Sequence, residues 1–258
     1  MKPVKKLAVH SLVALFIVGC ATAQPIEAAN VSGPCKSETV NDADYVVCRF
    51  AGDVDIRLFL NNAAGEPYKH FNWVNDALAE DGKRLVFAMN AGMYHEDRSP
   101  VGLFIEVGEA ISHTNNNDGP GNFHLKPNGV FFVSAGGQPQ VVATEEFVQI
   151  KQAPPKYATQ SGPMLVIDGE LHPKFLADST SRKRRNGVGV DESGDVWFVL
   201  ADTPVTFHEF GSYFRDVLKT PNALYLDGTI SRLYAPELER NDPGLAMGPI
   251  VGVVAQQN

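Results

Sequence analysis

The stretch VFAMNAGMYHEDRSPVGLFIEVG, residues 86–108, decides the fold prediction for this chain. An apolar run over residues 85–89 stops at Asn90, and Ala91, Gly92 and a polar stretch follow it. A second apolar run covers residues 101–107 and ends in a turn at Gly108. Short apolar runs bounded by turn residues are typical of strands. The pattern therefore predicts two strands, with Asn90 at the end of the first and able to bind a polar group.

The rest of the chain repeats this pattern and adds helices. Further strands are predicted at residues 45–50, 55–60, 164–167 and 223–226, and hairpins at 129–133 with 140–143 and 188–190 with 196–200. Helices are predicted at residues 71–82 and 206–218, and Thr206 with Glu209 forms a capping box at the start of the second. Since hairpins dominate, we predict an α+β fold with mixed or antiparallel sheets and flanking helices.

The N-terminus has the three-part layout of a secretory signal. Lysines near the start precede an apolar run over residues 7–18, and small residues occupy 19–23. We predict a signal peptide at residues 1–23, with an anchor helix as the alternative, and a single domain at 24–258. Residues 17–20 resemble a bacterial lipobox with Cys20 as the lipidated residue. Ordinary cleavage after residues 21–23 also fits, so both alternatives stay open.

Export would place the remaining cysteines, Cys35 and Cys48, in an oxidising compartment. We predict a disulfide between them, which would stabilise the N-terminal edge by about 3 kcal/mol in the chain-entropy model. Two free thiols are the alternative, and two cysteines without a nearby pair of histidines make a poor zinc site. The expected location is the periplasm, the outer membrane as a lipoprotein, or the medium.

The charge of the chain limits its partners. The formal net charge is -8 and the pI is near 5.3, whereas nucleic-acid-binding proteins are usually basic. We therefore expect no nucleic-acid partner, and membrane contact only through a lipid on Cys20. No cofactor or metal is predicted, although a divalent cation stays open, and the sequence does not indicate the oligomeric state.

Four segments combine a strand with small residues and a polar side chain: residues 90–92, 160–163, 185–189 and 226–231. Glycine allows a tight turn or a close approach of a ligand to the backbone. If the segments converge at strand-end turns, they offer a guanidinium group, a carboxylate, carboxamides and hydroxyls, a set that suits a phosphate or sugar phosphate. The candidate site residues are Asn90, Gly92, Ser161, Gly162, Arg185, Asp227, Gly228 and Ser231.

A long polar connection, SHTNNNDGPGNFHLKPNGVFFV at residues 112–133, adds further candidates. An ordinary connection has two to six residues, and Phe123 inside this one indicates that it packs against the domain. We predict a ligand-binding loop in which Asn122 and Asn128 bind hydroxyls or phosphate. His113 could move a proton, because the usual pKa of histidine permits it.

These segments, taken in chain order, resemble the phosphodiester glycosidase family. The resemblance rests on Asn-Ala-Gly-Met-Tyr at 90–94, Val-Gly-Leu at 101–103, Ser-Gly-Pro at 161–163, Arg-x-Gly-Val-Gly at 185–189 and Leu-Asp-Gly-x-x-Ser at 226–231. It spans residues 85–254, and residues 121–131 are similar to the bacterial branch. The resemblance implies an exported hydrolase that cleaves a sugar 1-phosphodiester at the glycosidic bond, giving free sugar and a phosphomonoester.

The resemblance also implies roles for single residues. Arg185 would hold the phosphate, and Asp227 would be the base or the electrostatic partner of the oxocarbenium-like centre, by analogy with carboxylate glycosidases. Thr229 and Ile230 depart from the family's Asp-Gly-Gly-x-Ser pattern, which leaves the sugar open. Glu106 and Asp202 are candidates for a second carboxylate, so the stereochemical outcome is open too.

Other functions remain as alternatives. The main one is a non-catalytic envelope protein that binds glycans or glycosyl-phosphate polymers, and another is an interaction module anchored by a lipid on Cys20. A hydrolase with Ser161 as nucleophile is less favoured, because Ser161 lacks the Gly-x-Ser-x-Gly frame.

Overall fold

The opening stretch forms strand β4, Lys83–Asn90, and the short strand β5, Phe104–Glu106. The computed structural model describes residues 34–228 and 230–257, together with residues 1 and 3. β5 is shorter than the predicted run over residues 101–107. The residues before β5 form a hydrogen-bonded turn instead. His95 N donates to Ser99 O at 2.8 Å, and Val101 N donates to Met93 O at 2.9 Å. Pro100 cannot donate to a neighbouring strand, so the chain enters β5 only after this turn.

The strands form three sheets, and every pairing of named strands in the described residues is antiparallel. The first has the order β1 (Cys35–Val40), β2 (Ala43–Phe50), β13 (Val196–Val205), β12 (Lys183–Val190), β14 (Asn222–Asp227), β10 (Met164–Ile167), β11 (Glu170–Leu171). The second has the order β16 (Arg240–Asn241), β15 (Leu233–Ala235), β4, β17 (Ile250–Gln256), β3 (Asp55–Phe59). The third has the order β6 (Glu109–Ser112), β5, β9 (Tyr157–Ser161), β7 (Gly129–Val133), β8 (Pro139–Ala143).

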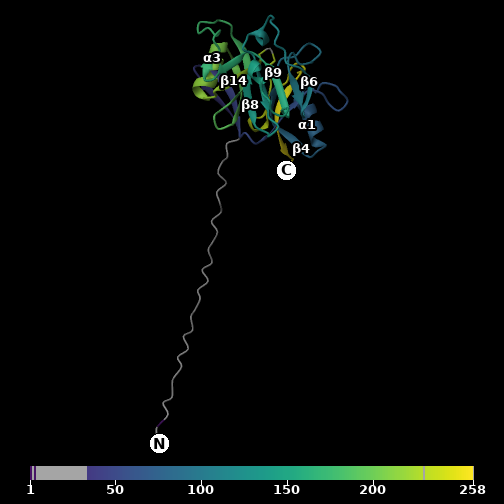
Figure 1. Ribbon diagram of the computed structural model, residues 1–258, viewed down its shortest axis with the longest axis vertical. Coiled ribbons are helices and arrows are strands. Elements are labelled where there is room, and N and C mark those ends of the chain that lie inside the picture. The colour runs from purple at the N-terminus through teal and green to yellow at the C-terminus, as the bar shows by residue number, and fades with distance from the viewer. Residues whose placement is uncertain (2, 4–33, 229, 258) are drawn as a thin grey trace. The chain divides into compact units, whose positions relative to one another are not determined.

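Helices are few and short, so the α+β prediction holds with more sheet than helix. Helix α1, Phe71–Ala79, packs beside β4 (Figure 1). Helix α3, Phe207–Ser212, begins with the predicted capping box and continues as a π-helical turn, Tyr213–Val217. The remaining pieces are α2 (Thr144–Phe147) and the 3₁₀ turns Asn122–His124 and Pro236–Leu238.

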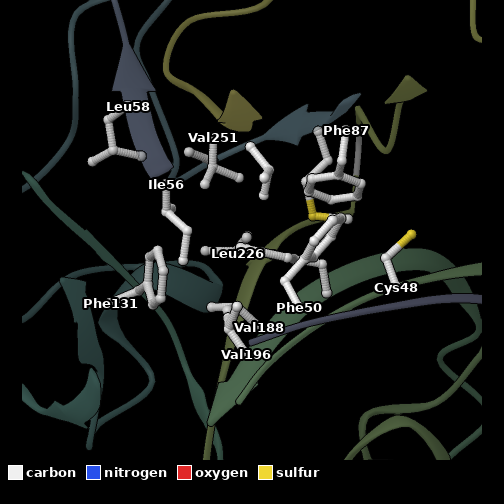
Figure 2. Close-up of a cluster of buried hydrophobic side chains, with 14 of the residues drawn as sticks. Cys48, Phe50, Ile56, Leu58, Phe87, Phe131, Val188, Val196, Leu226 and Val251 are labelled. Carbon is white, nitrogen blue, oxygen red and sulfur yellow. The ribbon is translucent and has the colours of Figure 1, made fainter. Parts of the chain in front are cut away.

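One apolar core joins the three sheets. Phe87 of β4 stacks on Phe198 of β13 with ring centroids 4.8 Å apart, and Phe131 of β7 meets Phe198 edge-on at 5.9 Å. Leu226 of β14 lies in the same cluster (Figure 2). Fully burying one such side chain stabilises a fold by about 1.5–3 kcal/mol. The core therefore fixes β4 and β14, which belong to different sheets, relative to each other.

The predicted disulfide between Cys35 and Cys48 is confirmed, with an S–S distance of 2.04 Å. The two cysteines face each other in the register of β1 and β2. The predicted signal peptide and Cys20 fall outside the described residues, apart from residues 1 and 3. None of the helices in the described part of the chain has the length and apolar character of a membrane span.

One part of the predicted site geometry is wrong. Residues 185–189 do not form a strand-end turn but lie inside β12, which extends five residues further toward the N-terminus than the predicted run at 188–190. The charged residues at 183–185 conceal this extension, because charged side chains are not typical of a strand in the core. Asn90, Ser161 and Asp227 do end their strands.

Candidate functional site

The ends of β4 and β14 meet at the side chain of Asn186, in the middle of β12. The Nδ2 of Asn186 donates to the carbonyl oxygen of Asn90 at 2.9 Å. Its Oδ1 accepts from the backbone N–H of Asp227 at 2.9 Å. Both asparagines are fully buried, so these hydrogen bonds are strong and costly to lose. Asn186 thus joins the first and second sheets where β14 ends at Asp227. The segment that follows, which includes Gly228 and Ser231, is called the Asp227 turn below.

Asn90 also forms hydrogen bonds with the residues around the Asp227 turn. Its Oδ1 accepts from the backbone N–H of Arg232 at 3.0 Å, and its Nδ2 lies 3.4 Å from the Oδ1 of Asn186. Asn90 has no exposed surface, and through these internal partners it positions Arg232. Its predicted contact with substrate stays a prediction.

Tyr225 and Asp227 lie at the end of β14, where the pairing with β12 shifts register: Gly187 pairs with Tyr225 and Asn186 pairs with Asp227. Burial raises the pKa of the Tyr225 hydroxyl, and the negative charge of Asp227 raises it further. Interactions with Arg185 and a hydrogen bond to Asn122 oppose this rise in pKa. The pKa of the Tyr225 hydroxyl therefore responds to a carboxylate, a guanidinium group and a loop amide.

Gly228 leaves room for that hydroxyl. A Cβ atom added at Gly228 would collide with the Oη of Tyr225 and lie 2.8 Å from the carbonyl oxygen of Arg184. The backbone N–H of Gly228 donates to the Oδ1 of Asp227 at 2.6 Å. Gly228 therefore lies next to both the tyrosine hydroxyl and the carboxylate.

Arg185 lies beneath Tyr225 and is 1% exposed. Its guanidinium group packs on the ring of Phe207 at 3.6 Å from the centroid, its Nε donates to Val205 O at 2.8 Å, and its Nη2 donates to Ser181 O at 3.1 Å. Burial lowers the pKa of Arg185, and Tyr225 opposes that shift. Because Arg185 and Asn186 are consecutive on β12, their side chains point to opposite faces of the sheet.

The polar loop reaches the site through Asn122. Asn128 is buried, and its Nδ2 donates to Phe123 O at 3.1 Å, which fixes the turn Asn122–His124. A Cβ at Gly162 would lie 2.7 Å from the Cβ of Asn128. The Oγ of Ser161 donates to the carbonyl oxygen of Leu226 at 2.7 Å. Asn128, Ser161 and Gly162 therefore hold the loop and the end of β14, while Asn122 itself is exposed.

Three other candidates are placed differently. A Cβ at Gly92 would lie 2.5 Å from Gln160 O, so the close approach at this glycine is to β9. The Oγ of Ser231 lies 3.4 Å from the carbonyl oxygen of Asp227, inside the turn. His113 is exposed after β6, and no contact recorded between described residues joins it to Asp227, Arg185 or Tyr225.

The two candidates for a second carboxylate lie elsewhere. Burial raises the pKa of Glu106 to about 7, and the charge of Glu106 acts on Tyr68 and Tyr157. Asp202 forms ion pairs with Arg184 at 2.6 Å and Arg240 at 2.8 Å. The recorded contacts of the described residues join neither carboxylate to Asp227. Those residues also contain no group of three or more His, Cys, Asp and Glu side chains able to hold a metal ion.

Comparison with known proteins agrees with the order of these segments. Residues 83–253 match the sequence profile of the phosphodiester glycosidase family. The chain belongs to this family. Among the curated relatives of the chain is the Escherichia coli K12 protein YigE, described as uncharacterized. It is 35% identical over 179 residues, which cover 69% of each chain.

Solved structures share the fold of this chain. The zebrafish N-acetylglucosamine-1-phosphodiester alpha-N-acetylglucosaminidase catalytic domain, auto-inhibited by its pro-peptide, matches with a TM-score of 0.61 and 14% identity over 85% of this chain and 81% of that one. A putative exported protein of Burkholderia pseudomallei matches with a TM-score of 0.56 and 10% identity, over 82% and 74% of the two chains. At these identities, the likeness shows the fold alone.

Sequence analysis missed Tyr225, Asn186 and Arg232. Tyr225 could have been found from its spacing, since it precedes Asp227 by two residues in a predicted strand. The sequence indicates Asn186 less clearly. A polar side chain inside a strand is buried only where another polar group can form hydrogen bonds with it, and the sequence does not show such a group. Nothing in the sequence indicates that Arg232 is buried near the end of β4.

Proposed function

We propose that the protein hydrolyses the glycosidic bond of a sugar 1-phosphodiester and releases free sugar and a phosphomonoester. The single observation that carries this proposal is the arrangement at the end of β14. Gly228 lies next to the Tyr225 hydroxyl and donates its N–H to the Asp227 carboxylate at 2.6 Å, and the guanidinium group of Arg185 lies 5.6 Å from the centre of the Tyr225 ring. A carboxylate near a guanidinium group and a hydrogen-bonding hydroxyl suits a substrate whose anomeric carbon carries a phosphate. Membership of the phosphodiester glycosidase family supports the same reaction.

The phosphate would accept hydrogen bonds from the Tyr225 hydroxyl and the Asn122 amide. Arg185 would supply positive charge from beneath rather than by direct contact, because its guanidinium group is enclosed by Phe207 and Tyr225. Such a fixed positive charge in a site of low dielectric favours the charge that develops on the leaving group. A phosphomonoester leaves as a stable anion, so the reaction needs little help from a general acid.

Asp227 would act on the anomeric carbon. As a base it would take a proton from the attacking water, and as a neighbouring charge it would stabilise the oxocarbenium-like transition state. Asn90 and Asn186 are then positioning residues, since they hold the backbone of the Asp227 turn. The configuration of the newly released sugar distinguishes retention from inversion.

We also propose that this chemistry takes place outside the cytoplasm, on a glycosyl phosphate or an envelope glycopolymer. The disulfide between Cys35 and Cys48 supports an oxidising compartment. The basic and apolar start of the chain supports export.

The proposal is tested by the turnover of a panel of sugar 1-phosphodiesters, N-acetylglucosamine derivatives included. Asp227→Asn should stay folded and lose kcat by on the order of 10²–10⁴-fold, the usual contribution of a catalytic base. Asp178→Asn, an exposed aspartate outside the site, is the matched control and should keep full activity. Sugar-phosphate binding without turnover in the wild-type protein would point to a glycan-binding envelope protein instead.

A further inference from the structure

Two adjoining cavities open beside Gly228 and Ser231, the residues that follow Asp227. The first has a volume of about 410 Å³, and its wall includes Gly228 and Ser231 of the turn. The second has a volume of about 400 Å³ and shares Arg232 with the first. The two cavities therefore continue the proposed reaction site along the surface.

Three arginines line the first cavity: Arg184, Arg232 and Arg240. Two carboxylates form ion pairs with two of these arginines. Asp202 pairs with Arg184 at 2.6 Å and with Arg240 at 2.8 Å, and Asp242 pairs with Arg240 at 2.8 Å. Three guanidinium groups against two carboxylates leave one positive charge over. The wall is thus cationic, and the ion pairs hold its side chains in place before any ligand arrives.

Arg232 supplies the charge that is left over. It is 7% exposed, and the described residues form no salt bridge with it. Its Nε donates to the carbonyl oxygen of Asp242 at 2.9 Å, and its Nη1 donates to that of Leu245 at 2.9 Å. Burial lowers the pKa of Arg232. The negative charge of Asp242 opposes this lowering of the pKa. A buried guanidinium group that is hydrogen-bonded to neutral carbonyl oxygens is stabilised further when another anion approaches it, and arginine is the usual partner of phosphate.

The second cavity has the groups that bind a sugar. Trp73 at its wall is 49% exposed, and its ring meets that of His70 edge-on at 5.3 Å. Beside it, the Nδ2 of Asn241 donates to the Oδ1 of Asn72 at 3.0 Å. An exposed aromatic face packs well against the apolar face of a pyranose, while amides and an imidazole bond its hydroxyls.

We infer that the two cavities bind the second phosphate of the substrate and the sugar that follows it, so that the substrate is a chain of sugars linked by 1-phosphodiester bonds and not a single small diester. Arg184 and Arg232 take the second phosphate, and Trp73 takes the third sugar, which follows that phosphate. Ile230, one of the departures from the family pattern, lines the first cavity and so helps to shape this subsite. The inference rests on the proposed function, because it assigns the first unit to the Asp227 site.

The test compares two probes: a synthetic trimer of N-acetylglucosamine linked by 1-phosphodiester bonds, and the methyl diester of N-acetylglucosamine 1-phosphate. We expect the wild-type protein to have a kcat/KM about tenfold or more higher for the trimer, as expected for one added charge-assisted phosphate contact. Arg184→Gln and Trp73→Ala should each reduce this preference markedly. These residues are chosen over Arg232, which also holds the 242–245 segment and whose loss could unfold it.

Arg182→Gln is the matched control. Arg182 lies two residues from Arg184 on the chain, but it pairs with Glu209 at 2.6 Å and does not line the cavities. The control should keep the wild-type preference for the trimer. Equal kcat/KM for trimer and monomer in the wild-type protein would overturn the inference and leave the proposed function standing.

Calorimetric titration of Asp227→Asn with both probes covers the case in which neither is turned over. Absence of turnover counts against the proposed reaction. Tighter binding of the trimer, lost when Arg184→Gln or Trp73→Ala is added, would then still support the two subsites. Equal binding of both probes, or no binding of either, would overturn the inference.

Discussion

At the scale of single residues, the proposed site depends on what surrounds Tyr225. Asp227, Gly228 and Asn122 were all predicted from sequence, because polar residues at strand ends and in long loops are typical of sites. Tyr225 was hidden because tyrosine fits any apolar strand. The burial of Arg185 was hidden too, because a run of basic residues gives no sign of which side chain points inward.

We predict that Gly228→Ala lowers kcat/KM by roughly 10- to 100-fold, the effect of losing one charge-assisted hydrogen bond. The added Cβ would displace the Tyr225 hydroxyl with which it collides. Tyr225→Phe should cause a similar loss. Kinetics of the double variant provide the check: a loss no larger than that of either single variant shows that both act through the hydroxyl, whereas additive losses would refute the coupling.

Glu106 gives a pH dependence of stability. Its carboxyl has a pKa of about 7 in the folded protein because it is buried, compared with an ordinary value of 4.5. The protonated form is therefore favoured by folding. Its stabilising contribution is full below pH 4.5 and is lost as the pH rises to about 7.

We predict that Glu106→Gln raises the Tm relative to the wild-type protein above this range but not below it. Thermal unfolding of both proteins at about pH 4 and about pH 8 measures the effect. A gain of roughly 2–4 °C at the higher pH corresponds to about 1 kcal/mol in a domain of this size. An identical difference in Tm at both pH values would contradict the assignment.

At the scale of elements, local patterns predicted most of the strands that run between clear turns, and the capping box located α3. They failed where pairing is non-local. Strand β17 takes its place between β3 and β4 from the far end of the sequence, and no local signal indicates that order. The extension of β12 to Lys183 was missed because its first residues are charged.

The junction of β4, β12 and β14 is the element-scale feature that matters most, and Asn186→Ala tests it. The variant leaves the carbonyl oxygen of Asn90 and the N–H of Asp227 without their buried partner. We predict a loss of about 1–3 kcal/mol for each group left unpaired, measured by urea unfolding. Asn186→Asp should also be destabilising, because it buries a charge. If Asn186→Ala unfolds like the wild-type protein, Asn186 does not join the sheets.

At the scale of the whole molecule, three antiparallel sheets share one core, and the family profile spans residues 83–253. The sequence predicted the fold class and the family, since motif order survives where overall identity does not. It could not predict how the sheets meet, because side chains such as Phe87 and Phe198 touch only in the folded chain.

The disulfide ties the N-terminal edge to this core. Replacing both cysteines, as in Cys35→Ser with Cys48→Ser, should lower the free energy of unfolding by about 3 kcal/mol, because the open chain gains entropy when unfolded. Denaturant unfolding of the variant and of the oxidised and reduced wild-type protein measures this. Reduction should destabilise the wild-type protein but not the variant. An equal response of both proteins to reductant would contradict the prediction.

The central claim is that water attacks the sugar and not the phosphorus, and hydrolysis in ¹⁸O-labelled water tests it most directly. N-acetylglucosamine 1-phosphodiester is incubated with the wild-type protein, and mass spectrometry locates the label in the two products. We predict label in the hydroxyl at the anomeric carbon and none in the phosphomonoester, with the reaction lost in Asp227→Asn. Label in the phosphate would show cleavage of the P–O bond and would contradict the proposed glycosidase mechanism.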